Sequence, residues 1–129
     1  MKRELISSGS PYEDSIGFSR AVRVGPYITV GGTAPLDENG KTVGIGDIAA
    51  QTKQCIETIK TALEKAGSGL EDVVRIRMLL TNIDDWKVAA EVRASYFKTI
   101  KPVDTIMQVS RFVDPDWLIE IEVDAILTE

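Results

Sequence analysis

Three segments of the chain alternate between apolar and charged residues with a period of two. They are residues 73–80 (VVRIRMLL), 103–110 (VDTIMQVS) and 118–127 (LIEIEVDAIL). A period of two is the spacing of a β-strand whose two faces meet different surroundings. The pattern therefore predicts a sheet with one apolar face under the helices and a second, mixed face.

The alternation assigns a set of charged and polar side chains to this second face. They are Arg75, Arg77, Asp104, Gln108, Glu120, Glu122 and Asp124. Leucine and isoleucine are interspersed among them, and lysine is absent from all three segments. Arginine favours planar pairing with carboxylates in partly buried places. Two interpretations stay open: a solvated sheet face, or a face covered by another subunit, with Arg–Glu pairs in the interface.

Two further segments have the periodicity of helices. Apolar residues recur at helical spacing over residues 48–66, behind Asp47, which is a good N-cap residue. Gly67 then stands in the position that ends a helix. A second helix is expected over residues 83–98, with Asn82 as its cap. Both helices connect strands of the predicted sheet.

Shorter strands are expected before the first helix. Residues 3–6 can form one, and residues 19–24 and 27–33 read as a hairpin around a Gly-Pro turn. The element order is then β-β-β-α-β-α-β-β, an α+β class with a mixed sheet and two helices on one face. The chain has 129 residues and no linker composition, so residues 1–129 are expected to form a single domain.

Charge and cysteine usage exclude several kinds of partner. The net charge is -5 and the pI is about 4.8, whereas phosphate binding needs clustered Lys and Arg, so no nucleic acid is expected. No apolar run is long enough to cross a membrane, and the N-terminus lacks the apolar region of a signal peptide. The lone cysteine, Cys55, lies on the apolar stripe of the first helix and reads as a core thiol. A cytoplasmic location without a membrane partner is expected.

Histidine is absent from the chain. This removes the usual general base, the usual zinc ligand and every Ser–His or Cys–His mechanism. Dinucleotide and phosphate-loop motifs are missing as well. No metal and no cofactor is expected, and any chemistry must rest on carboxylates, arginines, backbone groups or water.

Several motifs, in their order and spacing, resemble the RidA/YjgF family of reactive intermediate deaminases, also called L-PSP endoribonucleases. They are YITVGGTAPLDENGK, DIAAQTKQCIETIKTALEKAG, LEDVVRIRMLLTNIDDW, SYF and IEIEVDA. The resemblance covers nearly the whole chain. It implies a chorismate-mutase-like fold and a homotrimer whose sheets line a central barrel. It also implies a small-molecule site at each subunit interface.

The family's functional residues carry over only in part. In well-known members an arginine grips the substrate carboxylate, and this position is Asp104 here. A family tyrosine becomes Ser19, a serine becomes Gly31 and an asparagine becomes Ala90. The glutamate that holds the hydrolytic water is retained as Glu120. The chain thus resembles a divergent member, without the usual carboxylate-binding arginine.

A relocated site is one hypothesis. In it Arg77, with or without Arg75, supplies the positive charge, and Glu120 holds or activates water as the catalytic residue. The residues expected to orient the arginines are Asp104, Gln108 and Glu122. The alternative is that Arg77 only neutralises acidic side chains across an interface. Gly31 and Gly32 either allow close backbone approach to a ligand or serve a turn or bulge.

Three functions follow from these residues and the resemblance. The first is a small-molecule hydrolase or deaminase acting on an imine, an enamine or a related acidic metabolite. The second is a trimer that binds a metabolite or regulates a partner without catalysis. The third, an endoribonuclease, is disfavoured by the acidic charge and the missing histidine.

Overall fold

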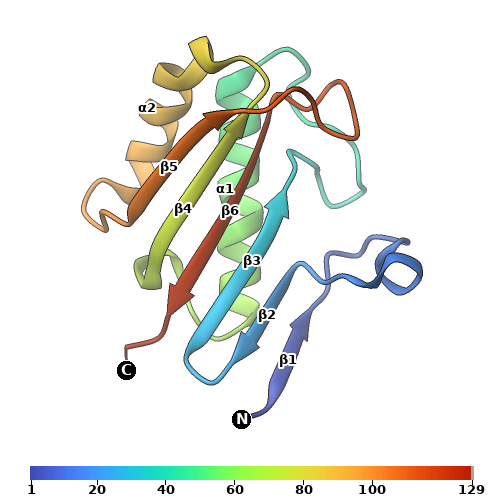
Figure 1. The fold of residues 1–129 in the computed structure, drawn as a ribbon, viewed down its shortest axis with the longest axis vertical. Coiled ribbons are helices and arrows are strands. Elements are labelled where there is room, and N and C mark those ends of the chain that lie inside the picture. Colours follow the sequence, from blue (N-terminus) through green and yellow to red (C-terminus); the bar gives the residue numbers. More distant parts are fainter. Residues whose placement is uncertain (129) are drawn as a thin grey trace.

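Six strands form one sheet in the computed structural model, which describes residues 1–128 (Figure 1). The strands are β1 (Arg3–Ile6), β2 (Ala21–Val24), β3 (Tyr27–Thr33), β4 (Val73–Leu80), β5 (Val103–Gln108) and β6 (Ile119–Ile126). Their order is β1-β2-β3-β6-β4-β5, and only β4 and β5 run parallel. The helices α1 (Ile48–Lys65) and α2 (Trp86–Phe97) lie on one face. The predicted order and the mixed sheet are confirmed.

Local signals set the ends of the helices. The Asp47 side chain accepts a hydrogen bond from the Ala50 amide at 3.1 Å, as an N-cap residue does. Gly67 follows α1 with φ +86, the left-handed conformation that favours glycine. The Asn82 side chain caps a short 3₁₀ turn, Ile83–Asp85, that leads into α2. Within residues 1–128, no helix combines the length and the apolar character needed to span a bilayer.

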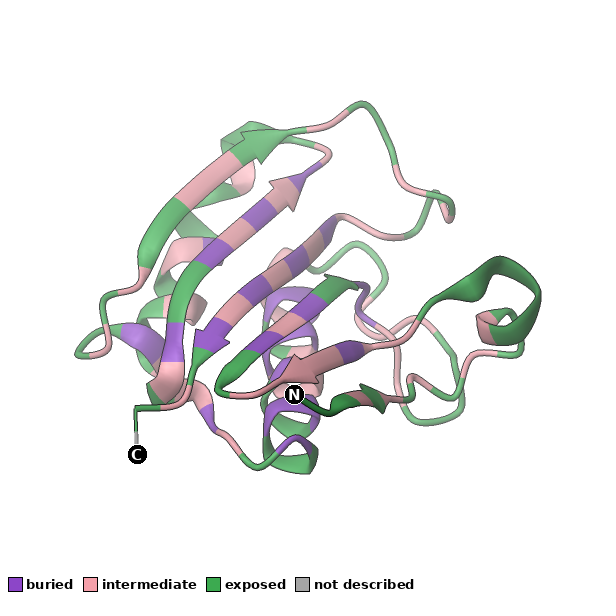
Figure 2. Ribbon diagram, turned by 60° about the horizontal axis from the view of Figure 1, so that its bottom comes forward, coloured by how far each residue is buried: buried purple, intermediate pink, exposed green. Residues whose placement is uncertain are grey.

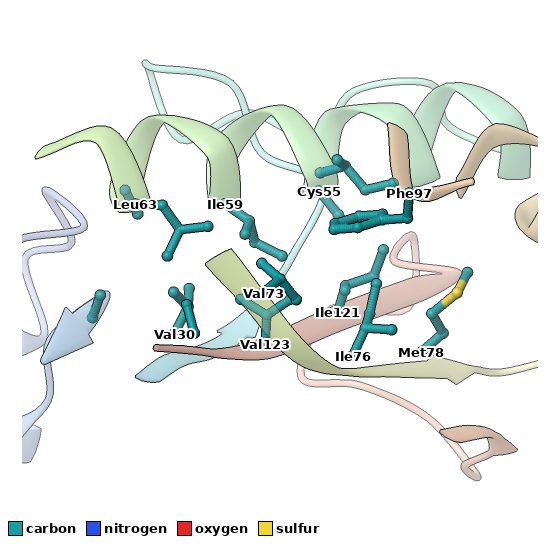
Figure 3. Close-up of a cluster of buried hydrophobic side chains, with 14 of the residues drawn as sticks. Val30, Cys55, Ile59, Leu63, Val73, Ile76, Met78, Phe97, Ile121 and Val123 are labelled. Atoms are coloured by element: carbon teal, nitrogen blue, oxygen red, sulfur yellow. The ribbon is translucent and has the colours of Figure 1, made fainter. Parts of the chain in front are cut away.

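The core lies between α1 and the sheet (Figure 3). Cys55, Ile59 and Leu63 point from α1 toward side chains of β3, β4 and β6, and Phe97 adds a ring from α2. Cys55 is fully buried, which confirms its interpretation as a core thiol. Each fully buried valine, leucine, isoleucine, phenylalanine or methionine side chain of this core contributes about 1.5–3 kcal/mol by leaving water.

The face opposite the helices is called the open face here, and its charged residues are Arg75, Arg77, Glu120, Glu122 and Asp124. Burial alternates along β6 (Figure 2), where Ile119 and Ile121 are buried while Glu120 and Glu122 are half-exposed. The predicted alternation is therefore confirmed for this strand.

Strand β5 faces the other way from its prediction. Asp104 pairs beside Ile76, and Gln108 beside Leu80, and both partners belong to the face under the helices. Asp104 and Gln108 are thus not on the open face, as the alternation had suggested. The reason is that β5 is an edge strand whose two faces both remain partly exposed, so hydrophobicity does not select its orientation.

A bulge also shifts the beginning of β4. Val73 pairs with Ala125 and Arg75 pairs with Asp124, so β4 has one residue more than β6 over this interval. The extra residue, Val74, is 41% exposed, and its predicted place on the apolar face is wrong. Beyond the bulge the alternation holds, since Arg75 and Arg77 lie on the open face.

Candidate functional site

The site begins with an irregularity in β3. Val30 pairs with Val123 and Thr33 pairs with Ile121, so two residues of β3 lie opposite one residue of β6. These two residues are the glycines of the GGT motif. The bulge lets both Val30 and Thr33 turn into the core, where they are buried, and leaves the glycines exposed.

Glu120 fills the space beside one of these glycines. A Cβ atom on Gly32 would lie 2.6 Å from Glu120 Oε1, so any side chain there would force the carboxylate to move. A Cβ on Gly31 would meet only the Arg20 carbonyl oxygen, at 3.8 Å, an ordinary contact. Neither glycine has a positive φ. Glycine is therefore favoured at position 32 because the Glu120 carboxylate occupies the space that a side chain would need.

Arg20 lies on the other side of Gly32, immediately before β2. Its Nη1 donates to the Gly32 carbonyl oxygen at 3.3 Å and to Thr33 Oγ1 at 3.2 Å. Its own carbonyl accepts from the Gly31 amide at 3.0 Å. The bulge thus brings one cation and one carboxylate to the two sides of a single glycine.

The surroundings of Glu120 alter its proton affinity. Burial raises the pKa of Glu120, the positive charge of Arg20 opposes the rise, and the neighbouring Glu122 adds to it. Burial is the largest influence. A carboxyl whose pKa moves toward neutrality can both take up and release a proton during a reaction.

The arginines of β4 have partners of their own on the open face. Arg77 Nη1 lies 3.0 Å from Glu122 Oε1, and Arg75 Nε lies 3.7 Å from Asp124 Oδ2. Asp124 also accepts from Thr29 Oγ1 at 2.7 Å. These pairs join strands of the same chain, so neutralisation does not require another subunit. The ligand-binding role of Arg77 and Arg75 stays a prediction.

Asp104 and Gln108 are not brought to these arginines. Asp104 accepts a hydrogen bond from Arg93 of α2, on the helix side. Gln108 Oε1 accepts from the Ile83 amide at 3.0 Å. The expectation that Asp104 and Gln108 orient Arg77 is therefore wrong, because β5 presents them to the opposite face. Of the expected orienting residues, only Glu122 contacts Arg77.

Sequence reasoning missed Arg20. It stands in the segment SRAVRV, next to Ala21, which is buried, so the alternation of a strand already places Arg20 on the opposite side. Nothing in the sequence indicated that the β3 bulge would bring Gly32 and Glu120 beside it. The position of Arg20 beside a buried residue could be read locally, but its proximity to Gly32 and Glu120 depends on pairing between strands that are distant in the sequence.

Two hollows on the described part of the chain lie away from Glu120. One lies between α1 and α2 and is lined by Ala49, Lys53, Val92 and Tyr96, among others. Another lies beside Arg23, Pro26, Leu127 and Thr128. Residues 1–128 contain no group of three potential metal ligands. Neither hollow is lined by Arg20 or Glu120.

Known proteins resemble the chain over most of its length. The family model described as Endoribonuclease L-PSP matches residues 11–127. A RutC family protein of Pyrococcus abyssi is 38% identical over 122 residues, which are 95% of this chain and 95% of that protein. The 3-aminoacrylate deaminase RutC of Acinetobacter baylyi is 41% identical over 121 residues, 94% of this chain and 95% of that protein.

Solved structures share the fold. Rv2704 of Mycobacterium tuberculosis, a member of the YjgF/YER057c/UK114 family, superposes with a TM-score of 0.88 at 42% identity, over 98% of this chain and 100% of that one. The YjgF gene product of E. coli superposes with a TM-score of 0.82 at 25% identity, over 95% of this chain and 98% of that one. The matches extend through the strands and the helices of the fold, and the chain belongs to the RidA/YjgF family, also called the L-PSP endoribonuclease family.

Proposed function

We propose that the protein is a hydrolytic deaminase of a small imine or enamine, with Glu120 as the residue that holds and activates water. The observation that carries this proposal is the Glu120 carboxylate itself, which lies against Gly32 beside a cation and has a raised pKa. The 41% identity to a 3-aminoacrylate deaminase supports a substrate of this class.

The reaction needs one group that moves a proton twice. Glu120 takes a proton from water while the water oxygen bonds to the carbon of a protonated imine. The resulting amino alcohol then receives that proton on nitrogen, the carbon–nitrogen bond breaks, and the hydroxyl group gives its proton to the leaving ammonia as the carbonyl forms. An enamine first gains a proton on carbon and becomes the imine. A protonated imine and water are thus converted to a carbonyl compound and an ammonium ion, with Glu120 unchanged.

We place this chemistry in clefts between the subunits of a homotrimer. The open face leaves large apolar side chains uncovered, among them Val103 at 58% and Met107 at 44% exposure. The half-exposed acids of β6 lie on the same face. Association through this face would remove water from Glu120 and strengthen its electrostatic interactions.

A trimer that binds a metabolite without turning it over is the second candidate. Asp104 stands where related deaminases have their carboxylate-binding arginine, and Arg93 holds it on the helix side. The two candidates differ in whether product forms. Ribonuclease activity is the weakest candidate, given the net charge of -5 and the absence of histidine.

A trapped-imine assay tests the proposal. A serine dehydratase would generate 2-aminoacrylate, 3-aminoacrylate would be tested in parallel, and carbonyl product would be followed with and without the protein. Wild type should accelerate release, and Glu120→Gln should lose about 100-fold or more of that activity. Glu38→Gln, on an exposed loop, is the matched control. Rates equal to the blank for wild type on both substrates would contradict the deaminase proposal and favour the binding trimer.

A further inference from the structure

Arg20 differs from the two arginines of the open face in its partners. Arg75 and Arg77 each have a carboxylate oxygen within 4.0 Å. Among residues 1–128, no carboxylate comes within that distance of Arg20, whose two side-chain contacts are a carbonyl and a hydroxyl. Arg20 therefore keeps a positive charge that no direct ion pair neutralises.

The acids whose charges act on Arg20 make no direct contact with it. Glu13 lies in the π-helical turn Glu13–Gly17, and its carboxylate accepts from Ser7 Oγ at 3.0 Å and from the amide and hydroxyl of Ser8. Burial favours the neutral form of Glu120. Both acids act on Arg20 across a distance, and neither occupies its hydrogen-bonding edge.

Among residues 1–128, the side-chain hydrogen bonds of Arg20 all use one nitrogen of the guanidinium. Both contacts to the protein use Nη1, which donates to Gly32 O and Thr33 Oγ1. A guanidinium has five N–H donors, and its Nε–Nη2 edge forms paired bonds to a carboxylate. The Nη1 contacts also fix the plane of the group, so little side-chain entropy remains to be lost when an anion binds.

We propose that Arg20 binds the carboxylate of the substrate and replaces the arginine that is missing at position 104. The inference rests on the proposed deaminase function for the identity of the reaction. Binding of a carboxylate by Arg20 does not depend on that reaction. Arg20 and Glu120 both adjoin Gly32, so the carboxylate and the reacting carbon must lie close together in the ligand. The substrate class is therefore a small imino or enamino acid whose carboxylate is attached at, or next to, the reacting carbon.

Paired substrates separate carboxylate binding from the chemical step. An amino-acid oxidase acting on leucine, and an amine oxidase acting on 3-methylbutylamine, produce imines that differ by the carboxylate. Arg20→Ala should reduce kcat/KM for the imino acid by about 10–100-fold more than for the neutral imine, because its effect on the pKa of Glu120 is common to both substrates. Arg3→Ala, which removes an exposed arginine, is the control for net charge. An equal loss on both imines would overturn the proposal.

Binding of the product-like anion pyruvate gives a readout that needs no turnover. Titration followed by NMR should show saturable binding to wild type and to Glu120→Gln, and binding about 10–100-fold weaker to Arg20→Ala. Arg20→Lys should be intermediate, because it keeps the charge and loses the paired geometry. If Arg20→Ala does not fold, Arg20→Gln, which keeps a donor for Gly32 O, decides the question.

The outcomes separate this proposal from the deaminase function. Pyruvate binding that depends on Arg20, without any turnover by wild type, would support the role of Arg20 while the deaminase function fails. If wild type turns over the imino acid and Arg20→Ala does so equally well, the deaminase function is supported and the role of Arg20 is overturned. Pyruvate binding that is lost in Arg77→Ala and kept in Arg20→Ala would overturn the proposal in favour of Arg77. Absence of pyruvate binding to wild type at millimolar concentration would overturn it as well.

Discussion

Gly32 and Glu120 are in such close contact that a methyl group on the glycine would lie 2.6 Å from Glu120 Oε1. Gly32→Ala should therefore displace the carboxylate and reduce deaminase activity by at least about 10-fold, while the free energy of unfolding should change by less than about 1 kcal/mol because the half-exposed end of Glu120 can move. Steady-state kinetics and urea denaturation measure the two effects.

Gly31→Ala is the matched control for that substitution. A Cβ at this position has only an ordinary contact, 3.8 Å from the Arg20 carbonyl oxygen, so stability should change by less than about 1 kcal/mol. Equal losses in both variants would contradict the role of Gly32 as space for Glu120.

The pH dependence of activity should reflect the raised pKa of Glu120. Activity requires the carboxylate, so it should fall with decreasing pH through a pKa above the ordinary range of glutamate. Arg20→Ala removes the charge that opposes the rise and should move this acidic limb to higher pH. Glu122→Gln should move it to lower pH. Profiles of kcat/KM against pH measure the shifts, and a limb that neither variant moves would contradict the assignment to Glu120.

The same raised pKa has a consequence for stability. A carboxyl whose pKa is higher in the folded state favours folding while it is protonated, and this contribution is lost as the pH rises through the folded pKa. Glu120→Gln should therefore be more stable than wild type near pH 7, and the difference should shrink toward acid pH. Urea denaturation at several pH values tests this sign, with Glu38→Gln as the control.

The interaction energy between Arg77 and Glu122 should show whether the open face is solvated or covered by another subunit. The two side chains are 36% and 32% exposed in the single chain, where such a pair contributes about 0.2–1 kcal/mol. Truncating one partner of a pair that association has buried costs about 3–5 kcal/mol. A double-mutant cycle, with the oligomeric state of each variant measured by light scattering, distinguishes a solvated face from a covered one.

Cys55 should be inert in the folded protein. It is fully buried, its Sγ lies 3.8 Å from the Ile119 carbonyl oxygen, and burial raises the pKa of its thiol. The thiolate is the reactive form, so a disulfide reagent should label Cys55 only after denaturant unfolds the chain. Stoichiometric labelling of the native protein within seconds would contradict this burial.

Signals that depend on neighbours along the chain were readable from the sequence. Asp47 and Gly67 set the ends of α1, and the alternation of β6 assigned its two faces correctly. These features follow from local backbone geometry and from hydrophobic periodicity, which short stretches carry by themselves. The class of fold and the order of its elements followed from them.

The site depended on pairing between distant strands. The sequence indicated Glu120, Gly31 and Gly32, but it assigned Asp104 to the wrong face and missed Arg20. An edge strand has no strong hydrophobic preference for one orientation, so only its register with β4 decided where Asp104 points. In the same way, the bulge in β3 exists because of its register with β6, and it alone brings Gly32 between Arg20 and Glu120.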